Sequence, residues 1–186
     1  TRMRIAMSSH YAVAVVGGDR PGIAAALAEA LHKAGANIED SRMSILGGRF
    51  AVMMLVSLPE GADLEALRAD LAQVRDSLGL DAAVIDPVEG AAAGARPEPT
   101  HVLTVYGADH PGIVHAVCSA LADRSVNIDD LATRLIGDDD APVYTLICEL
   151  TLPAGLSSND LTADLARVGE QQGVEVVLRE LDQDIL

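Results

Sequence analysis

The sequence contains one internal duplication, and this feature restricts the fold more than any other. The segment VVGGDRPGI at 15–23 returns ninety positions later as VYGADHPGI at 105–113. At the same offset, NIED at 37–40 falls on NIDD at 127–130, and about a dozen of the thirty positions that start at 11 match their counterparts. A repeat with a fixed period is typical of a chain built from copies of one structural unit. The duplication therefore predicts two domains of the same fold.

The boundaries of these domains follow from the repeat and from a change in composition between the copies. Gly, Ala and Pro dominate residues 87–100, which is typical of a linker of limited flexibility. We predict a first domain at 1–88, a linker at 89–100 and a second domain at 101–186. Domains of this size bury a modest fraction of their surface, so we expect the copies to associate.

Each copy shows the same order of strand and helix patterns. Pro21 and Pro111 are predicted to open helices, because proline leaves no amide hydrogen unpaired in a first helical turn. Ile23, Leu27 and Leu31 follow at steps of four, which places them on the inner face of the first helix. The elements predicted in the first copy are a strand at 11–16, this helix, a strand from Asn37 that turns at 47–48, a strand at 50–58, a helix at 64–78 and a strand at 81–86.

The order strand, helix, strand, strand, helix, strand is the split βαβ, or ferredoxin-like, arrangement. We therefore predict an α+β protein of two βαββαβ domains, each an antiparallel sheet with two helices on one face. In this topology the second strand lies at a sheet edge, and an unpaired edge tends to acquire a partner. We expect edge or face association of the copies, within the chain or in a homodimer. In the apolar strand at 50–58, one of Met53 and Met54 should enter the core and the other should face away from the helices.

Composition and charge argue against several classes of protein. The 13 basic and 28 acidic residues give a net charge of −15, which repels a phosphate backbone. Aromatic residues make up only 2% of the chain, so the side chains that stack on single-stranded bases are scarce. No stretch approaches the ~18 to 20 apolar residues that span a bilayer. We expect a cytoplasmic protein with no direct contact to nucleic acid or membrane, and two reduced, buried thiols at Cys118 and Cys148.

Both copies keep an Asp-x-Pro-Gly-Ile turn between the first strand and the first helix. The amide hydrogens and partial positive charge of a helix N-terminus attract a carboxylate or phosphate, and glycine lets a ligand approach the backbone closely. Asp19 and Asp109 in these turns have the charge to pair with an ammonium group, so the turns suit a zwitterion. Asn37 and Asn127 can donate and accept hydrogen bonds at once. The alternative is that these residues are ordinary turn and cap residues with no ligand.

The repeated GDRPGI and NIED motifs, each followed by a hairpin into an apolar strand, make the chain resemble a tandem pair of ACT domains. More narrowly, the first copy resembles the family of glycine cleavage system transcriptional repressors. The resemblance implies amino-acid sensing, with glycine or serine as the ligand, and action through a protein partner such as a transcription activator. It places the ligand between the first turn of one domain and the second strand of its neighbour. The site residues that it implies are Asp19, Gly22, Ile23, Asn37, Ile38, Asp109, Gly112, Ile113, Asn127 and Ile128.

The two copies depart from each other near these motifs. His110 replaces Arg20 in the second turn, and Leu131 and Ala132 replace Ser41 and Arg42. We therefore expect the two sites to be inequivalent. For Arg42 and Arg49, an exposed salt bridge is the plain expectation and contact with a ligand carboxylate is the alternative.

Signals for catalysis are weak. His110 and His115 lie five positions apart, which fits poorly the spacing of two zinc ligands on a helix. The run at 138–140 reads as a charged hairpin tip rather than a calcium loop. We predict a non-catalytic regulatory protein without cofactor or metal. The alternatives are an oligomerisation module without ligand and, by the same resemblance, the regulatory region of an amino-acid or one-carbon enzyme such as phosphoserine phosphatase or formyltetrahydrofolate deformylase.

Overall fold

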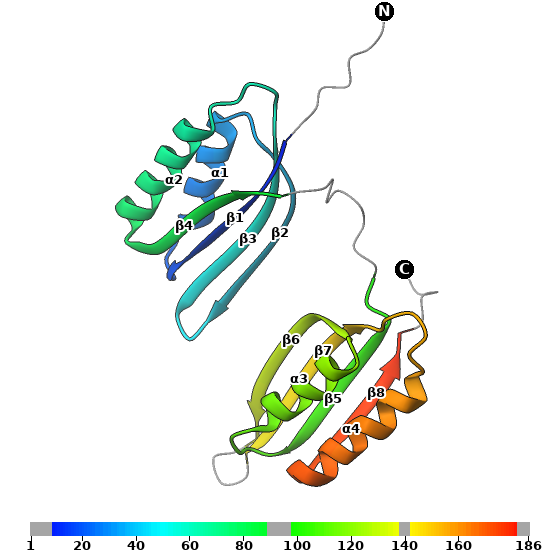
Figure 1. Cartoon of the computed structure of the whole chain (residues 1–186). Helices are drawn as coiled ribbons and strands as arrows, with labels where there is room; N and C mark the ends of the chain where they lie inside the picture. The colour runs from blue at the N-terminus through cyan, green and yellow to red at the C-terminus, as the bar shows by residue number, and fades with distance from the viewer. Residues whose placement is uncertain (1–8, 89–97, 138–141, 182–186) are drawn as a thin grey trace, which may run out of the picture. The chain divides into compact units, whose positions relative to one another are not determined.

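The computed structural model describes residues 9–88, 98–137 and 142–181. The chain divides into two compact units, Thr1–Ala95 and Arg96–Leu186, each with a four-stranded antiparallel sheet and two helices (Figure 1). The elements of the first unit are β1 (Ser9–Gly18), α1 (Ile23–Lys33), β2 (Asn37–Leu46), β3 (Arg49–Leu58), α2 (Leu64–Leu78) and β4 (Leu80–Pro87). Those of the second unit are β5 (His101–Ala108), α3 (Ile113–Asp123), β6 (Asn127–Ile136), β7 (Val143–Thr151), α4 (Ser158–Gln172) and β8 (Val174–Glu180).

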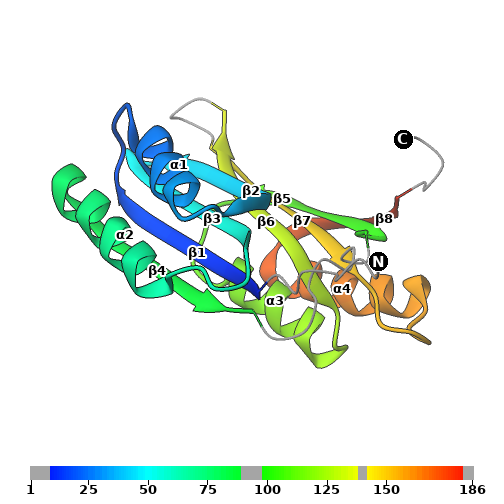
Figure 2. The same ribbon diagram turned by 90° about the horizontal axis from the view of Figure 1, so that it is seen from above.

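The strand order confirms the predicted ferredoxin-like fold in both units. The sheets run β2-β3-β1-β4 and β6-β7-β5-β8, so the second strand of each copy lies at an edge, as predicted. In the first unit α1 and α2 lie on one face of the sheet (Figure 2). The predicted hairpin turn is present at Gly47 and Gly48, whose φ angles of 56° and 74° suit a tight two-residue connection.

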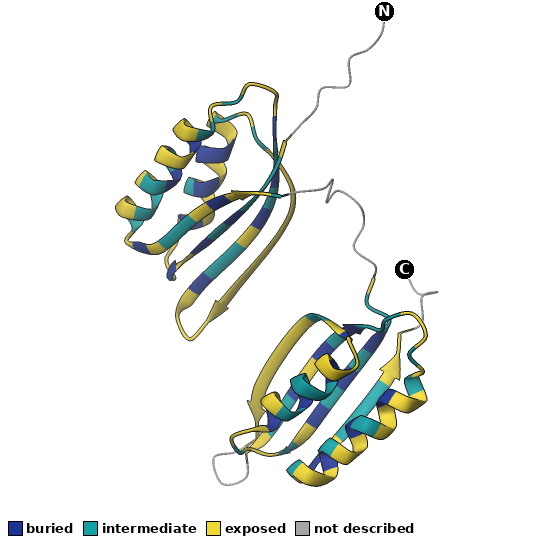
Figure 3. Cartoon of the chain, viewed as in Figure 1, coloured by how far each residue is buried: buried dark blue, intermediate teal, exposed yellow. Residues whose placement is uncertain are grey.

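The core of each unit lies between the sheet and its two helices, as the alternation of buried and exposed residues along the strands shows (Figure 3). In the first unit Val13 and Val15 on β1 pack with Leu27 and Leu31 on α1. Met54 is 6% exposed and Met53 is 60% exposed on the helix-free face, which confirms the expected division of the pair. Because aromatic residues are scarce, aliphatic side chains fill both cores.

The first helices begin later than predicted. Pro21 and Pro111 lie in the turns, and α1 and α3 begin two residues beyond them, after Gly22 and Gly112. Both glycines have positive φ, 98° and 110°, which a residue with a side chain adopts only with strain. The glycine therefore decides where the helix starts, and the proline restricts the turn that precedes it.

The edge strand β2 is exposed along its whole length. All ten of its residues are exposed, whereas each of the three other strands has residues buried in the core. A bulge interrupts its pairing with β3 between Ile38 and Asp40, and β6 has the same bulge between Ile128 and Asp130. None of the helices in the described ranges is long and apolar enough to cross a membrane.

Candidate functional site

The repeated turn leaves the N-termini of α1 and α3 without a side-chain cap. Gly22 and Gly112 occupy the N-cap positions, and no side chain accepts a hydrogen bond from the first amides of either helix. The other two helices are capped, since the Asp63 carboxylate accepts from Ala66 N at 3.0 Å and the Ser157 hydroxyl accepts from Asn159 N at 3.2 Å. Helices α1 and α3 also have no acidic residue in their first turns. Their first amide groups are thus available to an anion from outside the helix.

Neighbouring elements fix the position of each turn. In the first unit the backbone N–H of Asp19 donates to the carbonyl oxygen of Gly48 at 2.9 Å, so the turn is tied to the β2–β3 hairpin. A Cβ atom added at Gly22 would meet no atom within 4 Å. The backbone at this glycine is therefore open to an approaching molecule, and the exposed carboxylate of Asp19 lies three residues before it.

The second turn is held differently, through His110. Its Nε2 lies 2.7 Å from the carbonyl oxygen of Gln172 at the end of α4, and its Nδ1 lies 3.1 Å from the carbonyl oxygen of Pro111. The hydrogen bond to Gln172, followed by the one to Pro111, raises the pKa of His110 above its usual value of 6.5. A Cβ atom at Gly112 would lie 3.6 Å from Gln172 Oε1, so the end of α4 borders this turn.

Within one unit, the turn and the asparagine lie at opposite ends of the sheet. Gly18 is paired with Arg49 at one end of β3, whereas Asn37 is paired with Ser57 near the other. Eight strand positions separate these two β3 residues, or about 27 Å at ~3.4 Å per residue. The second unit has the same geometry, since Asn127 is paired with Thr151 and Ala108 with Val143. A single unit thus does not bring the two motifs together.

The two asparagines have different surroundings. The side-chain amide of Asn127 donates to Asp129 Oδ1 at 2.6 Å, and the Thr151 hydroxyl donates to Asp129 Oδ2 at 2.7 Å. In the first copy Glu39, at the same bulge, lies 3.2 Å from His10 Nε2. The bulge residues Glu39 and Asp129 were not among the predicted site residues, although the repeat aligns them beside the predicted asparagines.

The predicted isoleucines differ in exposure. Ile23 and Ile113 are each 1% exposed, so their side chains belong to the cores and only their backbone amides face the turn. Ile38 is exposed on the edge strand, and Ile128 is half-buried against the second core. For the ligand hypothesis, the side chains left accessible are therefore those of Asp19, Asn37 and Ile38 in the first copy.

The structure also describes other residues that the sequence analysis considered. Arg49 forms an exposed ion pair with Asp81, which is the simpler of the two roles expected for it. Cys118 and Cys148 are both free thiols; Cys148 is fully buried, and Cys118 is half-buried where full burial was expected. In the described part of the chain no cluster of His, Cys, Asp and Glu is arranged to hold a metal ion. The acidic run at 138–140 lies outside the described residues.

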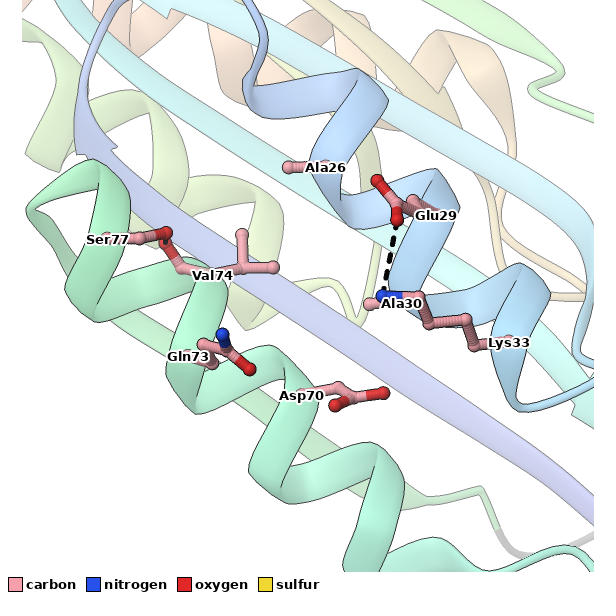
Figure 4. Close-up of a pocket in the computed structure, with 8 residues that line it drawn as sticks. All are labelled: Ala26, Glu29, Ala30, Lys33, Asp70, Gln73, Val74 and Ser77. Atoms are coloured by element: carbon pink, nitrogen blue, oxygen red, sulfur yellow. Dashed lines mark hydrogen bonds and ion pairs between the residues drawn. The ribbon is translucent and has the colours of Figure 1, made fainter.

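A groove of about 130 Å³ lies between α1 and α2 on the outer side of the first unit (Figure 4). Its walls carry Glu29, Lys33 and Asp70, and Glu29 forms an ion pair of 3.2 Å with Lys33. None of the predicted site residues lines it. The groove is small and polar, and the candidate site remains at the turns and the edge strands.

Comparison with known protein families agrees with the fold. Models of the ACT domain match residues 10–84 and 101–158, one in each unit. The chain belongs to the ACT-domain family. Its two ACT domains stand in tandem, which confirms the resemblance seen in the repeated motifs.

Similar proteins match the chain over more than one of its two units. The chain is 31% identical over 170 residues to a phosphoserine phosphatase of Mycobacterium tuberculosis, a match covering 90% of the chain and 40% of that protein. It is 30% identical over 133 residues to the glycine cleavage system transcriptional repressor of Escherichia coli, covering 68% of the chain and 66% of the repressor. A crystal structure of a protein of unknown function from Galdieria sulphuraria matches 95% of the chain and all of that protein, with a TM-score of 0.78 and 29% identity. The chain thus spans less than two thirds of both curated relatives.

Proposed function

We propose that this ACT-domain protein is a non-catalytic regulator that binds a small amino acid, glycine or serine, and controls transcription through a protein partner. The observation that carries the proposal is the contrast between capped and uncapped helices. Both helices that follow the repeated turn begin at an αL glycine without a side-chain cap, while the other two are capped by Asp63 and Ser157. An amino-acid carboxylate satisfies such amides, and Asp19 or Asp109 supplies the opposite charge for its ammonium group.

A complete site in this proposal takes residues from two ACT units. The turn and the asparagine of one unit are about 27 Å apart along the sheet, too far for one small amino acid to touch both. The ligand would therefore bind between the turn of one unit and the edge strand of a neighbour. Ligand binding would then favour association of the units. A coupling of ~1 to 3 kcal/mol would change affinity for the protein partner by roughly 5- to 150-fold.

The test is calorimetric titration of the whole chain with glycine, serine and the other common amino acids. We expect the wild-type protein to give a heat of binding with a small amino acid. The affinity for that amino acid should fall at least tenfold in Asp19→Asn and in Asn37→Ala. Asp86→Asn is the matched control, because Asp86 is an exposed carboxylate on β4 away from the turn. Absence of heat and of any thermal shift for all amino acids would contradict the proposal. A pull-down of a transcription activator that changes with glycine tests the partner.

An assembly module without a ligand is the second candidate, and the exposed edge strand favours it. Met43, Ile45 and Leu46 on β2 are large apolar side chains left 54%, 53% and 80% exposed. Such an edge pairs readily with another strand. This candidate predicts a stable oligomer whose size does not respond to amino acids, and sedimentation velocity with and without glycine separates it from the sensing proposal.

The regulatory region of an enzyme is the third candidate. It is favoured by the match to a phosphoserine phosphatase, 60% of which lies outside the region of similarity. In that case the two ACT domains would respond to an amino acid on behalf of a catalytic domain. Addition of the chain to a phosphatase domain, with activity measured against serine concentration, tests this relationship.

A further inference from the structure

His110 joins two elements that are far apart in the sequence. It lies in the turn between β5 and α3, and Gln172 ends α4, 62 positions later. The ring contacts a carbonyl oxygen on each side, that of Gln172 through Nε2 at 2.7 Å and that of Pro111 through Nδ1 at 3.1 Å. Both partners are acceptors that cannot donate.

The protonation state of the ring determines whether both contacts are hydrogen bonds. A neutral imidazole has one N–H donor and one nitrogen lone pair, so in either tautomer one nitrogen faces a carbonyl oxygen without a hydrogen between them. The imidazolium form donates from both nitrogens. The Gln172 carbonyl belongs to the negative end of the α4 dipole, which further favours a positive ring.

The charge of a neighbouring carboxylate acts in the same direction. Asp109 in the same turn raises the pKa of His110 through its negative charge. Glu170 precedes the end of α4, and Glu175, near the start of β8, accepts a hydrogen bond from Tyr106. From β7 the nearby titratable group is Tyr144, which burial keeps neutral by raising its pKa. Among the described residues that surround the turn, Asp109 is thus the carboxylate whose charge favours the imidazolium, while partial burial of the ring opposes it.

The first copy has a permanent cation at the equivalent position. The guanidinium of Arg20 lies at the end of α2, with Nη2 3.7 Å from the place of a Cβ atom on the C-cap glycine Gly79. An arginine remains charged throughout the physiological pH range. The two copies thus place a cation from the turn at the C-terminal end of their second helix, but only the second cation titrates.

We propose that His110 is a positioning residue that ties the second turn to α4 more strongly as an imidazolium, which donates to both carbonyl oxygens, than as a neutral ring, which donates to only one, so that the second ligand site responds to pH and the first does not. The effect on the ligand site rests on the proposed function, whereas the clamp itself does not depend on it. Because the folded protein holds the proton more tightly than a free histidine, the clamp has both hydrogen bonds below the ordinary pKa of 6.5 and keeps only one of them as the pH rises through the higher pKa of His110.

The amide protons of Ala116 and Ala26 provide a matched test in the ligand-free protein. Ala116 N–H donates to Gly112 O at 2.9 Å, and Ala26 N–H donates to Gly22 O at 3.0 Å. We expect the hydrogen-exchange protection factor of Ala116 to fall about fivefold between pH 6 and pH 8.5, because the neutral ring makes one hydrogen bond fewer to the groups that hold the turn. That of Ala26 should stay constant. His110→Arg should remove the pH dependence and keep the protection, whereas His115→Gln, an exposed histidine on α3, should leave the wild-type behaviour unchanged.

Glycine and serine titrations at both pH values test the ligand part of the inference. We expect the affinity of one site to fall about fivefold with rising pH in the wild type and to stay constant in His110→Arg. A pH-independent protection factor for Ala116 would overturn the clamp. Protection that changes with pH alongside constant affinity would overturn its control of the ligand site. Absence of binding at every pH would instead count against the proposed function, while the exchange data would still decide the clamp.

Discussion

The carboxylate of Asp164 on α4 accepts a hydrogen bond of 2.6 Å from Nε of Arg124, the residue that ends α3. Arg167, one turn further along α4, forms a second ion pair with the same carboxylate. Partial burial of Asp164 raises its pKa, but the two guanidinium groups lower it more, so its pKa lies below the usual 3.8. The ion pair therefore links the two helices of the second unit most strongly when Asp164 is charged.

Replacement of this carboxylate should reduce the stability of the second unit in a pH-dependent way. A group with a lowered pKa stabilises the fold above its unfolded value and loses this contribution as the pH falls through its folded value. We expect Asp164→Asn to lower the midpoint of unfolding at pH 7, and the difference from wild type to shrink below about pH 3.8. Urea unfolding between pH 2.5 and pH 7 measures this, with Glu170→Gln on the same helix as the control. A difference that stays constant with pH would show that charge is not the cause.

The glycine pair at the end of β1 gives a second prediction, because its two members have different surroundings. A Cβ atom at Gly17 would lie 2.6 Å from Leu80 Cδ2 and 2.9 Å from Leu80 Cα, whereas one at Gly18 would meet nothing within 4 Å. We expect Gly17→Ala to destabilise the first unit by about 1 to 3 kcal/mol, because the backbone of β4 must move. Gly18→Ala should be neutral or slightly stabilising. Denaturant unfolding of both variants checks the contrast.

The second copy supports this difference between the two glycines. Gly107 occupies the position of Gly17, and a Cβ atom there would lie 2.9 Å from Val174 Cγ1 and 3.1 Å from Val174 Cα. The position of Gly18 is already alanine in the second copy, Ala108. Equal stability losses for Gly17→Ala and Gly18→Ala would mean that backbone freedom, not the close approach of β4, requires glycine here.

The duplication made the fold predictable from the sequence, because two copies of each pattern remove the ambiguity of a single short strand or helix. The strand at 50–58 was correctly predicted, and β2 was correctly placed at the edge of the sheet. The start of the first helix was wrong by two residues, since the propensity of Pro21 for a first helical turn is weaker than the αL conformation of Gly22. Local preference rules gave the elements but not their capping geometry.

The candidate site was less predictable, because its geometry depends on contacts that are distant in the sequence. Asp19 and Asn37 are only 18 positions apart, yet the sheet places their elements at opposite ends. His110 was noted as a departure from Arg20 and as a poor match to a zinc ligand, but its role in the turn was missed, because its partner Gln172 comes from another helix. The repeat aligned these residues correctly. Tertiary structure alone shows which of them share an end of the sheet.

The two cysteines should differ in reactivity, which gives a last prediction. The Cys148 side chain on β7 is fully buried, and its burial, together with the nearby Cys118 and Asp130, raises the pKa of its thiol to about 12. Cys118 on α3 is half-buried, and its burial raises the pKa of its thiol less. Because the thiolate is the form that reacts, iodoacetamide at pH 8 should label Cys118 first and Cys148 only after unfolding in urea.

Mass spectrometry of peptides from the labelled protein measures the two rates separately. In Cys118→Ser, labelling of the native protein should become as slow as its global unfolding, because the remaining thiol lies in the core between β7 and the helices. Replacement of Cys148 by alanine should leave the rate at Cys118 unchanged and remove only the slow phase. Rapid labelling of Cys148 in the folded wild-type protein would contradict its assignment to the core, since a thiol sealed there has no route to the reagent without opening of the second unit.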